Sequence, residues 1–225
     1  MSDTESSKVE VEAFLADVSK RPQLRGNLIF ALDATASRER TWDTAARLQV
    51  QMFREAAVIG SLDVQLVYFR GMNDFGGECK ASTWVSDPMV LAKLMAKIRC
   101  DAGETQIGKV LTHVLREANQ RKINAVVFVG DCCEESRDKL VGPAKQLAGL
   151  KVPVFMFQEG GDQIARMRFQ ELAELTHGAY YRFDQGSARQ LGEVLKAVAT
   201  FAVGGVVALE RQGSDAAKLL LGQIR

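Results

Sequence analysis

The sequence alternates short apolar runs with longer amphipathic segments through most of its length, and this alternation constrains the fold more than any other feature. The clearest run, residues 125–129, reads Ala-Val-Val-Phe-Val and is typical of a strand that is buried on both faces. Strands that alternate with helices predict a mostly parallel sheet with helices on both sides. We therefore expect a doubly wound α/β domain.

The pattern predicts a six-stranded sheet. Its third strand follows the second after only about nine residues. A parallel return needs roughly a dozen residues or more, so this pair is predicted to be an antiparallel hairpin with the third strand at a sheet edge. Strands are expected at residues 27–32, 64–69, 79–85, 125–130, 154–158 and 179–183, and helices at 41–59, 87–99, 106–120, 137–147, 163–176 and 188–203.

The chain divides into three parts by composition. Residues 1–24 form a polar tail with a lead-in helix, residues 25–203 form the α/β domain, and residues 204–225 form a helical extension after Gly204 and Gly205. The longest apolar stretch, 197–209, is shorter than the roughly 18 residues of a membrane span, so it is expected to be a buried helix. The polar start lacks the layout of a signal peptide, which favours a cytoplasmic protein.

The composition narrows the classes of partner and cofactor. The 225 residues include 29 Lys and Arg against 28 Asp and Glu, without a dense basic run, so nucleic acid is not expected to be the main partner. The four cysteines contain no C-x-x-C, which indicates neither a disulfide framework nor a zinc knuckle. A chain of this length buries a full core without a structural metal, so a bound metal would serve function.

Oxygen-bearing side chains follow two of the predicted strands. Asp33, Thr35 and Ser37 come directly after the first strand with alanines between them, and alternate residues of an extended segment point the same way. Asp131 follows the fourth strand. Ligands of open α/β sheets bind beyond the carboxyl ends of the strands, so these side chains are expected to meet there.

Two carboxylates that converge without a basic partner repel each other, and a divalent cation removes that repulsion. Carboxylate, hydroxyl and water oxygens are the ligands of Mg²⁺, Mn²⁺ and Ca²⁺. The sequence therefore predicts a site for one of these ions. The alternative is that Asp33 and Asp131 merely cap the segments that follow them.

These residues resemble the metal-ion-dependent adhesion site of von Willebrand factor type A (VWA) domains, which uses D-x-S-x-S, a Thr from a second loop and an Asp from a third. Asp33, Thr35 and Ser37 match the first element, with Thr35 in place of the first serine. Thr105 matches the second and Asp131 the third. The similarity covers residues 26–201 and includes the antiparallel edge strand.

The resemblance implies that hydroxyls contact the metal, that the aspartates bind partly through water, and that a carboxylate of a partner protein fills one position. It implies a binding module rather than an enzyme, active in assembling or regulating a complex. The surface around the metal is expected to add contacts from exposed residues such as Arg38, Arg40, Phe75 and Glu134.

The rival hypothesis is an α/β cysteine hydrolase that uses Cys132 or Cys133. Both follow the fourth strand and precede a predicted helix, whose N-terminus can lower the pKa of a thiol. The two histidines, His113 and His177, are expected inside a helix and at a helix end, where they have structural roles. A phosphatase of the haloacid dehalogenase type needs a second Asp where this chain has Thr35, and is excluded.

Overall fold

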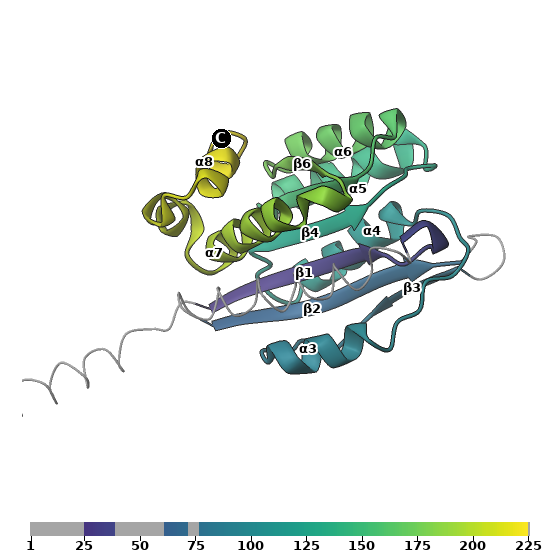
Figure 1. Cartoon of the computed structure of the whole chain (residues 1–225), viewed down its shortest axis with the longest axis horizontal. Helices are drawn as coiled ribbons and strands as arrows, with labels where there is room; N and C mark the ends of the chain where they lie inside the picture. The colour runs from purple at the N-terminus through teal and green to yellow at the C-terminus, as the bar shows by residue number, and fades with distance from the viewer. Residues whose placement is uncertain (1–24, 39–60, 72–76, 225) are drawn as a thin grey trace, which may run out of the picture.

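The computed structural model describes residues 25–38, 61–71 and 77–224, and their strands form one six-stranded sheet (Figure 1). The strand order is β3-β2-β1-β4-β5-β6, and every neighbouring pair is parallel except β2 and β3. The predicted doubly wound sheet with an antiparallel edge strand is therefore confirmed. The strands are β1 (Arg25–Asp33), β2 (Ser61–Arg70), β3 (Glu78–Ala81), β4 (Ala125–Gly130), β5 (Val154–Glu159) and β6 (Tyr180–Phe183).

Helices cover both faces of the sheet (Figure 1). One face is covered by α3 (Pro88–Met95) and α7 (Ala188–Gln212), and α8 (Asp215–Leu221) follows α7. The other face is covered by α4 (Ile107–Ala118), α5 (Arg137–Gly149) and α6 (Gln163–Leu175). The predicted lead-in helix and the predicted helix 41–59 lie outside the described residues.

The central strands have apolar side chains on both faces because each face packs on its own layer of helices. Leu28, Phe30 and Leu32 of β1 lie in the core beneath α7, whereas Ile29 and Ala31 lie in the core beneath α4 and α5. Alternate residues of a strand point to opposite faces, so a strand between two helical layers must be apolar at every position. The sequence shows this pattern in β1 and β4.

The edge strand is shorter than predicted. Residues 79–85 were expected to form one strand, but β3 ends at Ala81 and pairing resumes only as an isolated bridge between Val85 and Val64. Ser82 interrupts the ladder because its hydroxyl accepts from the Leu66 amide at 3.0 Å and donates to the Thr83 carbonyl at 2.6 Å. A side chain that bonds nearby backbone competes with the strand ladder.

The last long helix bends at the predicted glycine pair. Gly205 has φ 64° and ψ −159°, a conformation outside the helical region that costs glycine little, and the helix resumes up to Gln212. Leu209, Ala217 and Leu220 beyond the bend are buried in the same core as α7.

One helix in the described part of the chain is long and apolar enough to cross a membrane by length and composition. It is Arg189–Gln212 within α7, whose most apolar window has a mean hydropathy of 1.6 and is 56% buried in the structure. The expected buried helix at 197–209 therefore belongs to a longer one, whose side chains pack against the sheet.

Candidate functional site

The carboxyl ends of β1 and β4 bring Asp33 and Asp131 to one edge of the sheet. The two strands are parallel neighbours with Leu32 opposite Val129, so each chain reaches its aspartate at a similar height. Asp33 is 1% exposed and Asp131 is half-buried. The two carboxylates interact electrostatically, because the negative charge of Asp131 raises the pKa of Asp33.

The hydroxyls of Thr35 and Ser37 lie together, but the segment after β1 has a different conformation from the extended one that was predicted. Residues 36–38 form a short 3₁₀ turn, so the segment is not extended beyond Thr35. Thr35 donates its amide to Asp33 Oδ1 at 2.7 Å, and its Oγ1 lies 3.0 Å from Ser37 Oγ. The turn therefore brings the two hydroxyls together, close to the Asp33 carboxylate.

Two carboxylate oxygens at this edge are buried and have no hydrogen-bond partner among the described residues. They are Oδ2 of Asp33 and Oδ1 of Asp131. Burial raises the pKa of Asp33 to about 6, and the charge of Asp131 adds to the shift, although bonds from Thr35 oppose it. A buried acceptor without a donor is costly, so these oxygens are suited to a ligand that supplies positive charge.

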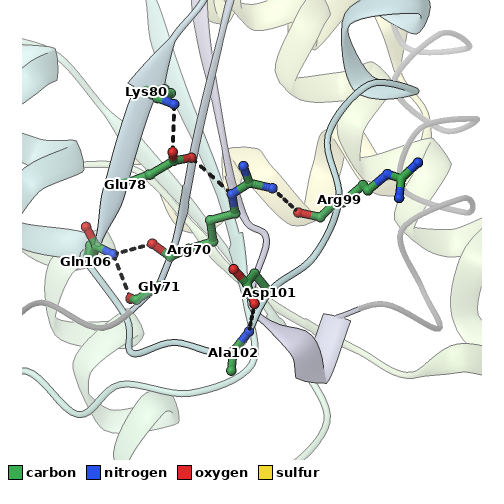
Figure 2. Close-up of polar contacts among 8 residues, drawn as sticks. All are labelled: Arg70, Gly71, Glu78, Lys80, Arg99, Asp101, Ala102 and Gln106. Atoms are coloured by element: carbon green, nitrogen blue, oxygen red, sulfur yellow. Dashed lines mark hydrogen bonds and ion pairs between the residues drawn. The ribbon is translucent and has the colours of Figure 1, made fainter. Parts of the chain in front are cut away.

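The loop that carries Thr105 is held against the ends of β1 and β2 by backbone contacts (Figure 2). Arg70 of β2 donates to the Arg99 carbonyl at 2.7 Å, and Gln106 donates to the carbonyls of Arg70 and Gly71 at 3.0 and 3.2 Å. The Asp101 amide donates to the Ala34 carbonyl at 3.0 Å. These contacts fix the loop at the same edge as Asp33.

Glu134 joins this loop to the one after β4. Its Oε2 accepts from the Thr105 hydroxyl at 2.6 Å and from the Thr105 amide at 3.1 Å, and its own amide donates to Thr105 Oγ1 at 3.2 Å. All five predicted site residues therefore belong to loops at one edge of the sheet. The Thr105 hydroxyl, however, is engaged with Glu134 rather than directed to a shared ligand.

Glu135 has a role that the sequence analysis missed. Its carboxylate accepts from the amides of Ile107 and Gly108 at the start of α4, where Gln106 provides no side-chain cap. A carboxylate at a helix N-terminus satisfies free amides and complements the helix dipole. The signal is absent from the sequence because Glu135 and α4 are 27 to 28 residues apart.

The position of Arg38 contradicts two expectations, that this residue is exposed and that the two aspartates have no basic neighbour. It was predicted to be exposed, but it is 1% exposed and is the largest fully buried side chain in the described part of the chain. It forms an ion pair with Glu159 at the end of β5, and Asp131 and Asp33 both act on it electrostatically. The two aspartates therefore do have a basic neighbour. Burial lowers the pKa of Arg38, against the effect of these carboxylates.

Of the other residues expected on the surface around the site, Glu134 is exposed, whereas Arg40 and Phe75 lie outside the described residues. Within the described residues, no group of three or more His, Cys, Asp or Glu side chains is placed to hold a metal. A metal at this edge would therefore depend on the hydroxyls as well as the two carboxylates.

The cysteines after β4 are not activated. The helix α5 begins only at Arg137, so neither thiol lies at its N-terminus. Burial, followed by the charges of Asp131 and Glu134, raises the pKa of Cys132 to about 12. Burial also raises the pKa of Cys133 to about 11. The expectation that a helix N-terminus could lower these pKa values is wrong.

The two histidines have the predicted structural positions. His113 lies within α4 and bonds Gln65 Oε1 at 2.8 Å through Nε2, and burial lowers its pKa. His177 follows Thr176, the C-cap residue of α6, with φ 55°. Within the described residues, neither histidine forms a hydrogen bond with Cys132 or Cys133.

No family model matches the sequence, and no curated protein matches it either. Solved structures do match. The type A domain protein of Catenulispora acidiphila has 12% identity and a TM-score of 0.60 over 80% of this chain and 43% of its own. The VWA domain of SpRpn10 has 12% identity and a TM-score of 0.59 over 77% and 94%. The chain has the fold of a VWA domain.

A third match is an aerotolerance-related membrane protein from Bacteroides fragilis, with 18% identity and a TM-score of 0.59 over 77% of this chain and 98% of that one. The chain spans less than half of the Catenulispora structure and nearly all of the other two. At these identities the likeness concerns the fold, and a fold does not define a function.

Proposed function

We propose that this chain is a protein-binding module that uses a divalent cation, Mg²⁺ in the first place, to capture a carboxylate of a partner protein. The ion would be held by Asp33, Thr35, Ser37, Thr105 and Asp131. A divalent ion in such a site supplies a Lewis-acid position that attracts an outside carboxylate. No covalent step is part of this function, so the module is proposed to be a binding protein and not an enzyme.

The observation that carries the proposal is the pair of buried carboxylate oxygens, Asp33 Oδ2 and Asp131 Oδ1, that lack a hydrogen-bond partner among the described residues. Simple capping would account for Asp33 Oδ1, which accepts from Thr35, but leaves the other oxygen unexplained. The adjacent hydroxyls of Thr35 and Ser37 complete a set of hard oxygen donors.

Two features of the chain would have to accommodate the ion. Arg38 already places a positive charge near Asp33 and Asp131, which lowers the electrostatic gain from a cation. Thr105 is bonded to Glu134, so its hydroxyl would exchange that contact for the ion. Both features favour a moderate metal affinity. The hydrogen bond between Thr105 and Glu134 should also change when an ion binds at this edge of the sheet.

Titration calorimetry with Mg²⁺ and with Mn²⁺ tests the metal site. We expect binding to the parent chain, loss of binding in Asp33→Ala and weaker binding in Thr105→Val. Asp215→Ala, at an exposed position of α8, is the control because it removes one carboxylate far from the site. Equal affinity of the parent and Asp33→Ala would reject the proposed site.

The partner is tested by affinity capture of cell proteins with the parent chain, in Mg²⁺ and in a chelator. A partner that is retained in Mg²⁺, lost on chelation and lost with Asp33→Ala would support metal-dependent capture. A partner that persists under both conditions would place the docking surface elsewhere on the module.

The cysteine hydrolase stays the alternative function, although the raised pKa of both thiols disfavours a nucleophilic thiolate. A screen of ester, amide and phosphoester substrates tests it, with the double variant Cys132→Ser, Cys133→Ser as the matched control. Turnover that the double variant abolishes would assign the chain to the enzymes.

A further inference from the structure

A second candidate site lies on the sheet face covered by α4, away from the aspartates. It is an open groove of about 660 Å³ between β3 and α4. The residues that line it include four cationic side chains, which are Lys80, Lys109, Arg116 and Lys139. Among the described residues that line the groove, Glu135 supplies the one carboxylate.

The positive charge of the groove is largely available to a ligand. Glu135 accepts from the amides at the start of α4, although the charge of Lys139 also acts on its carboxylate, so it offsets only part of the positive charge. All four cationic side chains belong to exposed residues. Lys80 pairs with Glu78 at 2.7 Å, an exposed pair that contributes little, and Lys109 donates to the neutral Gln106 Oε1 at 3.0 Å.

Two of the four cations lie along α4, and the other two belong to β3 and α5. Lys109 and Arg116 lie seven residues apart on the helix, a rise of about 10 Å, and both act electrostatically on the Cys79 thiol in the same groove. His113 lies between them as a neutral group, because Arg116 Nη2 approaches its Nδ1 at 3.3 Å while Nε2 bonds Gln65. One small anion cannot contact both Lys109 and Arg116.

We propose that this groove binds an extended acidic segment of a protein partner. In an extended chain, alternate side chains lie about 7 Å apart on one side, so flexible Glu or Asp side chains along one segment can reach both Lys109 and Arg116, which are about 10 Å apart on α4. The adjacent strand β3 is the edge strand of the sheet in the described part of the chain.

An acidic peptide fits the groove better than a nucleic acid does. No Phe, Tyr or Trp is found among the described residues that line it, whereas single-stranded nucleic acids are bound by stacking on aromatic side chains. The net charge of +1 also gives the chain no general attraction for polyanions. The proposal is independent of the metal site, since none of the five predicted metal ligands lines the groove.

Fluorescence anisotropy of the full chain tests the groove, with a labelled 12-residue peptide that alternates Glu and Ser as the probe. The buffer contains EDTA, so that carboxylate capture by a metal is excluded. The variant Lys109→Glu, Arg116→Glu reverses two charges of the groove. The control variant, Lys93→Glu, Lys97→Glu, also reverses two charges. Lys93 lies in α3 and Lys97 just after it, on the opposite face of the sheet.

We expect the groove variant to raise the Kd by about tenfold, and the control and Asp33→Ala to leave it unchanged. The neutral variant Lys109→Gln, Arg116→Gln should fall between parent and reversal, and it keeps the test valid if the reversal unfolds the chain. Binding should weaken as salt rises, because the charges are exposed.

Three results would contradict the proposal that the groove binds an acidic segment, and none of them would bear on the proposed metal site. The first is an equal loss of affinity in the control variant. The second is equal binding of a peptide with Gln in place of Glu. The third is tighter binding of a labelled oligonucleotide of 12 nucleotides, which would assign the groove to nucleic acid.

Discussion

Asp33 destabilises the metal-free fold at neutral pH. Its pKa is raised to about 6 in the folded chain against an ordinary 3.8, chiefly by burial. As pH rises from about 4 to about 6, the unfolded chain loses this proton first, so the free energy of unfolding falls across that window. Above about pH 6 the ionised carboxylate is a constant cost.

Asp33→Asn should therefore stabilise the metal-free protein at pH 7.5 by about 2 kcal/mol, and have little effect near pH 4. The amide oxygen can still accept from the Thr35 amide, so the local turn is preserved. Urea unfolding at the two pH values, in EDTA, measures the effect. A less stable variant at pH 7.5 would mean that Asp33 acts as a structural cap.

Arg38 supplies the opposite charge at the same edge. Replacing it by Met leaves Glu159 buried without its ion-pair partner and removes the cation that acts on Asp33 and Asp131. We expect Arg38→Met to lower the free energy of unfolding by about 3 kcal/mol without metal. Added Mg²⁺ should restore more stability to this variant than to the parent.

The matched control is Arg137→Met, which removes an ion pair with Glu171 at a half-exposed position. An exposed pair contributes about 0–1 kcal/mol, so this variant should stay close to the parent in urea unfolding. Equal stability of Arg38→Met and Arg137→Met would show that the buried guanidinium does not stabilise the site.

Residue types and strand order placed Asp33, Thr35, Ser37 and Asp131 at one edge of the sheet, and the resemblance to VWA domains added Thr105. They could not reveal that Arg38 turns inward, because its burial depends on Glu159, which lies 121 residues further along the chain at the end of β5. They also could not reveal the bonds between Glu134 and Thr105, since these form only when two distant loops meet.

Among the structural elements, the position of the loop between α3 and α4 depends on close contact between the backbones of Gly103 and Gly71. A Cβ on Gly103 would lie within 2.6 Å of the Gly71 carbonyl oxygen and would also collide with the Gly71 amide. Backbone cannot move aside as a flexible side chain can, so Gly103→Ala must displace the loop from the end of β2.

We expect Gly103→Ala to weaken Mg²⁺ binding by about tenfold through the displaced Thr105, and to cost about 1–3 kcal/mol of stability. Gly142→Ala is the control, because a Cβ there meets nothing within 4 Å and α5 gains a better helix former. Calorimetry and thermal unfolding measure the two effects. Unchanged metal affinity in Gly103→Ala would separate this loop from the site.

The elements themselves were largely predictable. Strands β1 and β4 are apolar at successive positions because helices cover both faces, so their sequence pattern has one structural explanation. The early end of β3 was not predictable, since it depends on a hydroxyl contact between Ser82 and Leu66 across the hairpin. The break at Gly205 was predicted, whereas the second break at Gly213, with φ 63° between α7 and α8, was not.

At the scale of the whole molecule, the proposed metal site and the core are separate. Two apolar cores lie on the two faces of the sheet, and the donor side chains lie beyond the strand ends. A core of this size holds the fold without a metal. An ion that binds only the folded chain then adds stability by mass action and leaves the architecture unchanged.

Mg²⁺ at about 100 times its Kd should therefore add about 2.7 kcal/mol to the free energy of unfolding. Chelation should remove that increment without unfolding the chain, so the far-ultraviolet circular dichroism spectrum stays the same while Tm falls. The size of the increment should grow with the logarithm of the Mg²⁺ concentration in the parent and vanish in Asp33→Ala. If chelation instead abolished the spectrum of the folded parent, the ion would be part of the core architecture, and the separation of site from core would be wrong.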